Sequence, residues 1–294
     1  MSISNTHTRR ELLAAAGAAG LTLSPMLRAL LAAEEKPRFQ ISACDWSIGC
    51  GGNIRAFEVA KAVGLDGVEV SFGGPGGEFD LRKEEVRKQY REAAKKNGIE
   101  ISSLAMGVLN GVPYSSDPQA EQWVEECIGV MAAMRQRIVL LAFFGRGDIK
   151  GKPGLQKEVI RRLKKVAPLA EKAGVVLGLE TWLNADEHLH ILDAVGSAAV
   201  MVYYDVANMT TKGYDVCKEI RRLGKRICQF HMKENGHLLG KGEVDFPKVK
   251  QAIDDVGYGG WLVIEGARPG GMSLEEAYAA NQEYVRSIFP TGNK

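Results

Sequence analysis

Short, continuous runs of apolar residues recur along the chain and alternate with longer segments in which apolar residues return every three to four positions. Continuous runs are typical of parallel strands covered by helices, and the longer segments are typical of amphipathic helices. Eight runs predict strands, at residues 39–44, 67–72, 99–105, 137–144, 175–180, 200–205, 226–231 and 261–265. The segments between them predict helices over about 54–63, 81–97, 118–134, 155–173, 185–195, 214–223, 246–256 and 273–289.

This succession of eight strand and helix pairs predicts an α/β fold, a single (β/α)8 TIM barrel over residues 38–290. The 294 residues, less an N-terminal leader, match the roughly 250 residues typical of such a barrel. An open, doubly wound sheet is the competing architecture, but its phosphate-binding GxGxxG motif does not follow the first strand. No linker divides the chain, so we expect one domain.

Residues 1–33 do not fit the barrel pattern and predict a twin-arginine export signal. Residues 8–13 read TRRELL, and a stretch rich in Ala, Gly and Leu follows them. The apolar stretch from Leu12 to Leu27 is shorter than the roughly 20 residues that cross a bilayer, and Pro25 interrupts it. We therefore expect the twin-arginine export machinery to carry the chain to the periplasm, with no stable membrane anchor.

Charge and cysteine content narrow the classes of partner. Removal of residues 1–33 takes away three arginines and one glutamate, so the remaining chain carries equal numbers of acidic and basic residues. A chain without net charge has no long-range attraction for a polyanion, which argues against a nucleic-acid partner. The five cysteines show no CxxC spacing, which argues against a zinc cluster or a disulfide framework.

Four strands in the second half of the chain end on a side chain that could bind a metal: Glu180, Asp205, His231 and Glu265. The carboxyl ends of barrel strands meet at one rim, so we expect these side chains to converge there. Three carboxylates gathered in a buried mouth would repel one another and lose hydration unless a cation neutralised them. The pattern therefore predicts a bound divalent metal. Carboxylate ligands favour Mn²⁺ or Mg²⁺, with Co²⁺ or Zn²⁺ as alternatives.

A metal site of this kind favours proton transfer next to a carbonyl group. Its open positions would hold a substrate hydroxyl and a neighbouring carbonyl, and the cation would stabilise the enediolate formed by deprotonation. Glu180 and Glu265 come from separated strands, so the two can serve as base and acid. Return of the proton to the opposite face inverts a carbon, and its return to the neighbouring carbon moves the carbonyl. The geometry therefore covers epimerases and isomerases.

Short segments at five strands carry a family resemblance. They are GLDGVEV at 64–70, GLE at 178–180, YYDVAN at 203–208, FHMKE at 230–234 with GKGEVDF at 240–246, and GYGGWLVIEG at 257–266. The sequence resembles the xylose isomerase-like TIM barrels, specifically the sugar phosphate isomerase and epimerase branch related to D-tagatose 3-epimerase and hydroxypyruvate isomerase. The resemblance implies that Glu180, Asp205, His231 and Glu265 bind the metal, that Glu180 and Glu265 form the acid–base pair, and that the substrate is a small-molecule sugar.

Asn208 and His237 stand where this family usually has a histidine and an arginine. Asn208 can still hydrogen-bond a sugar hydroxyl, whereas His237 cannot reproduce a permanently charged guanidinium. We predict substrate-binding roles for both residues. We predict the same role for Lys233, which points into the mouth if its strand continues, and for Trp46, which follows the first strand. Glu69 lies inside the second strand and is expected to hydrogen-bond within the barrel.

Other functions stay open beside a metal-dependent sugar isomerase or epimerase. A lyase or dehydratase on a keto-sugar or 3-keto-glycoside could use the same deprotonation and then expel a β-substituent. A non-catalytic sugar-binding protein could keep the fold. A phosphodiesterase of the endonuclease IV type would need several more metal-binding histidines than the five of this chain provide.

An exported enzyme is expected to act on a neutral or oxidised sugar. The sequence leaves the oligomeric state open, with a homo-oligomer as one alternative.

Overall fold

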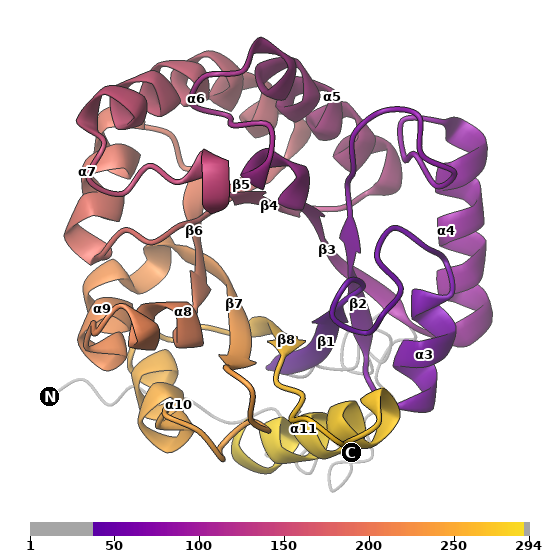
Figure 1. The fold of residues 1–294 in the computed structure, drawn as a ribbon. Helices are drawn as coiled ribbons and strands as arrows, with labels where there is room; N and C mark the ends of the chain where they lie inside the picture. The colour runs from indigo at the N-terminus through magenta and orange to yellow at the C-terminus, as the bar shows by residue number, and fades with distance from the viewer. Residues whose placement is uncertain (1–37, 291–294) are drawn as a thin grey trace, which may run out of the picture. The chain divides into compact units, whose positions relative to one another are not determined.

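Eight parallel strands close into a barrel in chain order, and helices surround it (Figure 1). The structure, a computed structural model, describes residues 38–290. The strands are β1 (Phe39–Cys44), β2 (Gly67–Ser71), β3 (Glu100–Met106), β4 (Ile138–Ala142), β5 (Val176–Glu180), β6 (Val200–Asp205), β7 (Ile227–Glu234) and β8 (Gly260–Gly266). Each strand pairs with the next, and β8 pairs with β1 to complete the cylinder. The predicted (β/α)8 barrel is confirmed. The export signal predicted for residues 1–33 lies outside the described residues.

The helices follow the strands as predicted, with ends shifted by a few residues. They are α3 (Ala56–Ala62), α4 (Glu84–Asn97), α5 (Pro118–Met134), α6 (Pro153–Ala173), α7 (Ala185–Val195), α8 (Val206–Thr211), α9 (Val216–Leu223), α10 (Phe246–Asp255) and α11 (Leu274–Ile288). Short 3-10 turns are η1 (Gly107–Asn110), η2 (Gly145–Gly147) and η3 (Gly224–Arg226). None of the helices within residues 38–290 is long and apolar enough to cross a membrane.

Two elements at the rim differ from the prediction. Helix α8 begins directly after β6, and its six residues are too few to show a helical period in the sequence. Strand β7 continues three residues beyond His231, where Lys233 pairs with Glu265 and Glu234 with Gly266 of β8. Two of those three residues are charged, so the apolar pattern of the sequence ends at His231 although the strand does not. Both differences shape the mouth of the barrel.

The barrel interior holds a mixed layer of side chains, separate from the larger apolar core between strands and helices. Its apolar members are Cys44, Ala105, Leu140, Ala142, Val176, Tyr203, Cys228 and Val263. Gly178 makes room for one of the largest, because a β-carbon there would lie 2.9 Å from Cys228 Sγ and 3.2 Å from Tyr203 Cβ. Glu69 and Gln229 are also fully buried inside. Ser103 and Tyr203 hydrogen-bond both Glu69 and Gln229 there, while Gln229 Oε1 has no partner among the described residues.

His188 on α7 is a buried histidine with two uncharged partners. Its Nδ1 lies 3.1 Å from the backbone oxygen of Asn184, and its Nε2 lies 3.0 Å from Thr181 Oγ1. Burial lowers the pKa of His188 to about 4. The ring is therefore neutral in the folded protein at neutral pH, and it has a packing role as the helical position suggests.

Replacement of His188 should change how stability depends on pH. Below pH 6.5, its ordinary pKa, the unfolded chain gains a proton that the folded chain accepts only near pH 4. The stability that depends on a neutral His188 is thus complete above pH 6.5 and is lost as the pH falls to 4. Between pH 7 and 4, the unfolding free energy of the wild type should fall by roughly 3 kcal/mol more than that of His188→Gln.

Urea unfolding at a series of pH values measures this difference. His190→Gln provides the matched control, because His190 is exposed on the same helix. The control should follow the wild-type curve. Parallel curves for the wild type and His188→Gln would contradict the prediction.

Candidate active site

The carboxyl ends of β5, β6, β7 and β8 bring Glu180, Asp205, His231 and Glu265 together. One ligand atom from each of the four lies within 4.8 Å of the others. Strand register produces this arrangement, since Asp205 is paired with His231 across β6 and β7. Three of the side chains are buried, and Glu265 is partly buried. The residues predicted from strand ends thus form one group that could hold a metal ion.

His231 lies at the centre of this group, with one ring nitrogen facing the carboxylates. Its Nδ1 is 2.9 Å from Glu180 Oε1, 3.4 Å from Glu265 Oε2 and 4.0 Å from Asp205 Oδ2. Burial works to lower the pKa of His231, but the surrounding acidic groups outweigh it and raise that pKa well above its usual value. The ring can therefore carry positive charge that offsets the carboxylates when no cation is bound.

Asp205 supplies the observation that best fits a metal. Its Oδ1 accepts a hydrogen bond of 2.8 Å from the backbone N–H of Asn208 and so caps α8. Its Oδ2 is buried and has no hydrogen-bond partner among the described residues. Burial is the main cause that raises the pKa of Asp205 to about 7. The Lys233 ammonium lies 3.6 Å from this oxygen, too far for a hydrogen bond. A buried carboxylate oxygen without a hydrogen bond is costly, and a cation between the four side chains would satisfy it.

The two glutamates differ in electrostatic environment. Burial raises the pKa of Glu180 above its usual value. Burial also acts on Glu265, but the charges of His231 and Lys233 outweigh it and lower the Glu265 pKa to about 2. Lys233 Nζ lies 2.9 Å from Glu265 Oε2, and Trp46 Nε1 donates to Glu265 Oε1 at 3.1 Å. Carboxyl groups with pKa values pushed in opposite directions are typical of acid–base pairs.

A cavity of about 800 Å³ opens over this group. Glu180, Glu265, Lys233 and Asn208 line one side of it. The first half of the barrel and the residues after β5 add the apolar and aromatic side chains of Phe72, Phe79, Val108, Phe144 and Trp182, beside polar ones that include Glu78, Asp80 and Asn110. The rings of Phe144 and Trp182 pack edge to face with centroids 4.8 Å apart. The cavity therefore joins a charged floor to an aromatic wall.

Three of the four predicted substrate-binding residues reach this cavity. Trp46, Asn208 and Lys233 line it, and Lys233 does so because β7 continues as the prediction required. Trp46 is 37% exposed, one of two large hydrophobic residues of residues 38–290 with that much exposure. His237 is exposed in the loop after β7 and does not line the cavity. Their roles toward a substrate stay predictions.

Sequence reasoning missed Asp45 and Trp182. Asp45 is buried after β1 and accepts hydrogen bonds from the backbone of Gly52 and from the backbone and hydroxyl of Ser71, which fastens the first rim loop to the end of β2. Burial raises its pKa to about 6. Trp182 lies two residues beyond Glu180, and this spacing after a strand end could have marked it as a cavity residue.

The closed parallel barrel, with a carboxylate-rich group at its C-terminal mouth that could hold a metal, defines the class of protein as a (β/α)8 barrel. The chain belongs to the xylose isomerase-like TIM barrel family, whose sequence model matches residues 57–288. The resemblance carried by the five strand segments is thus confirmed.

Relatives by sequence and structure include sugar epimerases. The chain is 24% identical over 223 residues to a D-psicose 3-epimerase of Enterocloster bolteae, which covers 70% of this chain and 73% of the relative. It is 27% identical over 214 residues to a 2-epi-5-epi-valiolone 7-phosphate 2-epimerase of Actinoplanes sp. This match covers 69% of this chain and 78% of the relative.

Two solved structures share the fold over almost their whole length. A D-psicose 3-epimerase in the presence of D-fructose aligns with a TM-score of 0.72 and 17% identity, over 85% of this chain and 99% of that one. A 3-keto-D-glucoside 4-epimerase from E. coli aligns with a TM-score of 0.69 and 16% identity, again over 85% and 99%. Epimerases are isomerases, so the two relatives by sequence agree with the predicted class of enzyme.

Asp205→Asn should weaken binding of Mn²⁺ by about 100-fold or more, because it removes a charged ligand. Asparagine is a good helix N-cap, so α8 should remain capped and the fold intact. Titration of the metal-free protein with Mn²⁺, followed by electron paramagnetic resonance, measures the affinity. Asp193→Asn, which changes an exposed carboxylate on α7, should bind Mn²⁺ like the wild type. Equal affinity in Asp205→Asn would exclude Asp205 as a ligand.

Proposed function

We propose that the chain is a divalent-metal-dependent sugar epimerase or isomerase. The observation that carries this proposal is the convergence of Glu180, Asp205, His231 and Glu265 beneath a cavity that Glu180 and Glu265 line. Asp205 Oδ2, which is buried without a hydrogen bond, supports a cation at the centre of the group. Mn²⁺ or Mg²⁺ best suits three carboxylates and one imidazole. The epimerase relatives support the same class of reaction.

The side chains of the site have separate tasks in this reaction. A divalent ion held there would polarise a substrate carbonyl and offset the negative charge that develops on deprotonation. One of Glu180 and Glu265 removes a proton from the carbon next to that carbonyl, and the other returns a proton. Lys233 and Trp46 hold the two oxygens of Glu265 by hydrogen bonds. They therefore orient this carboxylate before a substrate arrives.

A neutral sugar is the substrate that fits the charges of the cavity. Among the described lining residues, Lys233 is the one with a cationic side chain, and Glu265 and Asp205 already engage it at 2.9 Å and 3.6 Å. A phosphate group needs charge-assisted donors such as arginine, and the described lining offers no arginine and no lysine besides Lys233. The proposed substrate is therefore an unphosphorylated keto-sugar.

Cavity size favours one alternative, a lyase or epimerase acting on a keto-glycoside. At the roughly 30 Å³ that water occupies per heavy atom, the twelve heavy atoms of a hexose fill at most about 360 Å³. That is less than half of the available 800 Å³. The aromatic wall could hold a second ring. In the lyase case, the electron pair left by deprotonation expels the second ring as an alcohol, which takes up a proton.

Incubation of the protein with Mn²⁺ in D₂O separates these functions. The panel of substrates contains D-fructose, D-psicose, L-ribulose and a 3-keto-glucoside, and products are followed by NMR and mass spectrometry. An epimerase or isomerase gives an isomer that carries deuterium at the reacting carbon, whereas a lyase releases an alcohol. Glu180→Gln and Glu265→Gln should each lower turnover by about 100-fold or more. Glu92→Gln, an exposed change on α4, should have no effect.

Chelation of the metal should abolish turnover, and added Mn²⁺ should restore it. Sugar binding without deuterium exchange in the wild type would instead identify a non-catalytic binding protein. Turnover that survives in both glutamine variants would rule out the proposed acid–base pair.

We also propose that residues 1–33 direct export to the periplasm. The TRRELL segment and the apolar stretch after it support the proposal. Arg9→Lys combined with Arg10→Lys should leave full-length protein in the cytoplasm of a bacterial host, as judged by fractionation and immunoblotting. Arg28→Lys, outside the twin-arginine pair, should be exported normally. Export of the double variant at the wild-type level would overturn this assignment.

A further inference from the structure

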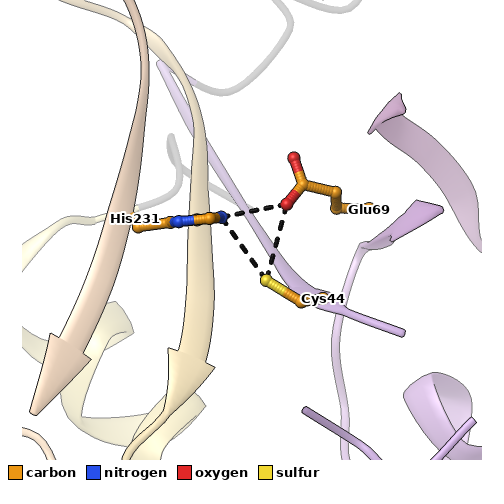
Figure 2. Close-up of side chains that lie close together, drawn as sticks. All are labelled: Cys44, Glu69 and His231. Carbon is orange, nitrogen blue, oxygen red and sulfur yellow. Dashed lines mark hydrogen bonds and ion pairs between the residues drawn. The ribbon is translucent and has the colours of Figure 1, made fainter. Parts of the chain in front are cut away.

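A buried cluster lies behind the candidate active site and contacts the second nitrogen of His231. Figure 2 shows Cys44 of β1, Glu69 of β2 and His231 of β7 pointing toward one another. All three are fully buried, and they do not line the cavity. The acid–base and metal-binding roles proposed above leave Cys44 and Glu69 without a task.

Distances within the cluster fit hydrogen bonds. Glu69 Oε1 lies 2.9 Å from His231 Nε2, the usual length of an N–H···O bond. Cys44 Sγ is at 3.4 Å from Nε2 and 3.5 Å from Glu69 Oε1, which suits a weak thiol contact.

Both oxygens of Glu69 are held in place. Oε2 accepts hydrogen bonds from Ser103 Oγ at 2.6 Å and from the Tyr203 hydroxyl at 2.7 Å. Gln229 Nε2 in turn donates to Ser103 Oγ at 2.9 Å and to the Tyr203 oxygen at 3.0 Å. The hydroxyl protons are thereby directed at Oε2. Oε1 is left to accept the Nε2 proton of His231.

We propose that Glu69 is a positioning residue that holds His231 with its proton on Nε2 and its Nδ1 free to bind the metal. The inference rests on the proposed metal site. It adds that four strands, β2, β3, β6 and β7, cooperate to fix the orientation of a single ligand. A carboxylate behind a metal-binding histidine typically contributes 10–100-fold to metal affinity, because it fixes the ring and makes it a better donor.

Two neighbouring tyrosines on β6 offer a matched pair of variants. Tyr203 donates to Glu69, whereas the Tyr204 hydroxyl is buried and has no hydrogen-bond partner among the described residues. Each substitution by phenylalanine removes one buried hydroxyl. The two variants should therefore differ in the network to Glu69 and in little else.

The experiment measures binding of Mn²⁺ alone to the full chain by electron paramagnetic resonance. Glu69→Gln keeps the shape of the side chain and should weaken Mn²⁺ binding 10–100-fold. Tyr203→Phe should weaken it about 3–10-fold, since one of two bonds to Oε2 remains. Tyr204→Phe should stay within about twofold of the wild type. If Glu69→Gln fails to fold, the tyrosine pair still decides the question.

Nitrogen-15 NMR of the histidine rings gives a readout that a packing role would not change. In the metal-free wild type, the Nε2 proton of His231 should be hydrogen-bonded to the Glu69 carboxylate and protected from exchange with solvent. In Tyr203→Phe, the same proton should exchange with solvent faster. Mn²⁺ affinity and exchange that are the same in Tyr203→Phe and Tyr204→Phe would overturn the inference. Absence of Mn²⁺ binding in the wild type would instead refute the proposed metal site, and the ring protons would still test the role of Glu69.

Discussion

One electrostatic constraint underlies this structure, the burial of three carboxylates and an imidazole together at the mouth of the barrel. Such a group is tolerable only if each charged oxygen has a partner. Lys233 and Trp46 take the oxygens of Glu265, and His231 takes one of Glu180. Asp205 Oδ2 is the buried oxygen without a hydrogen bond, with Lys233 Nζ 3.6 Å away, and a cation there would complete the arrangement. Electrostatic balance, rather than packing alone, thus defines this end of the molecule.

Strand β7 carries three inward-pointing residues that belong to different parts of the site. Side chains two residues apart on a strand point to the same face, so Gln229, His231 and Lys233 all point into the barrel. Gln229 belongs to the buried hydrogen-bond network, His231 to the group that could hold a metal, and Lys233 to the cavity wall. One strand therefore connects the interior of the barrel to the surface where a substrate would bind. The extension of β7 beyond His231 is what brings the third of these residues into position.

Much of this could be predicted from the sequence, because apolar runs locate parallel strands and strand ends locate the rim. The convergence of Glu180, Asp205, His231 and Glu265 follows from that logic alone. Helix α8 was missed because six residues show no period, and the extension of β7 was missed because its last residues are polar. The contact between Glu69 and His231 joins residues 162 positions apart, and its length depends on barrel register, which no local pattern records.

The two sides of the cavity come from different parts of the chain. Its charged floor comes from β5 to β8, whereas much of its aromatic wall comes from the segments after β2, β3 and β4. Since the groups proposed to move protons are absent from that wall, substitutions there can alter which molecule fits without disturbing the reaction itself. Within a lineage of such proteins, selectivity and chemistry are therefore free to evolve on separate stretches of sequence.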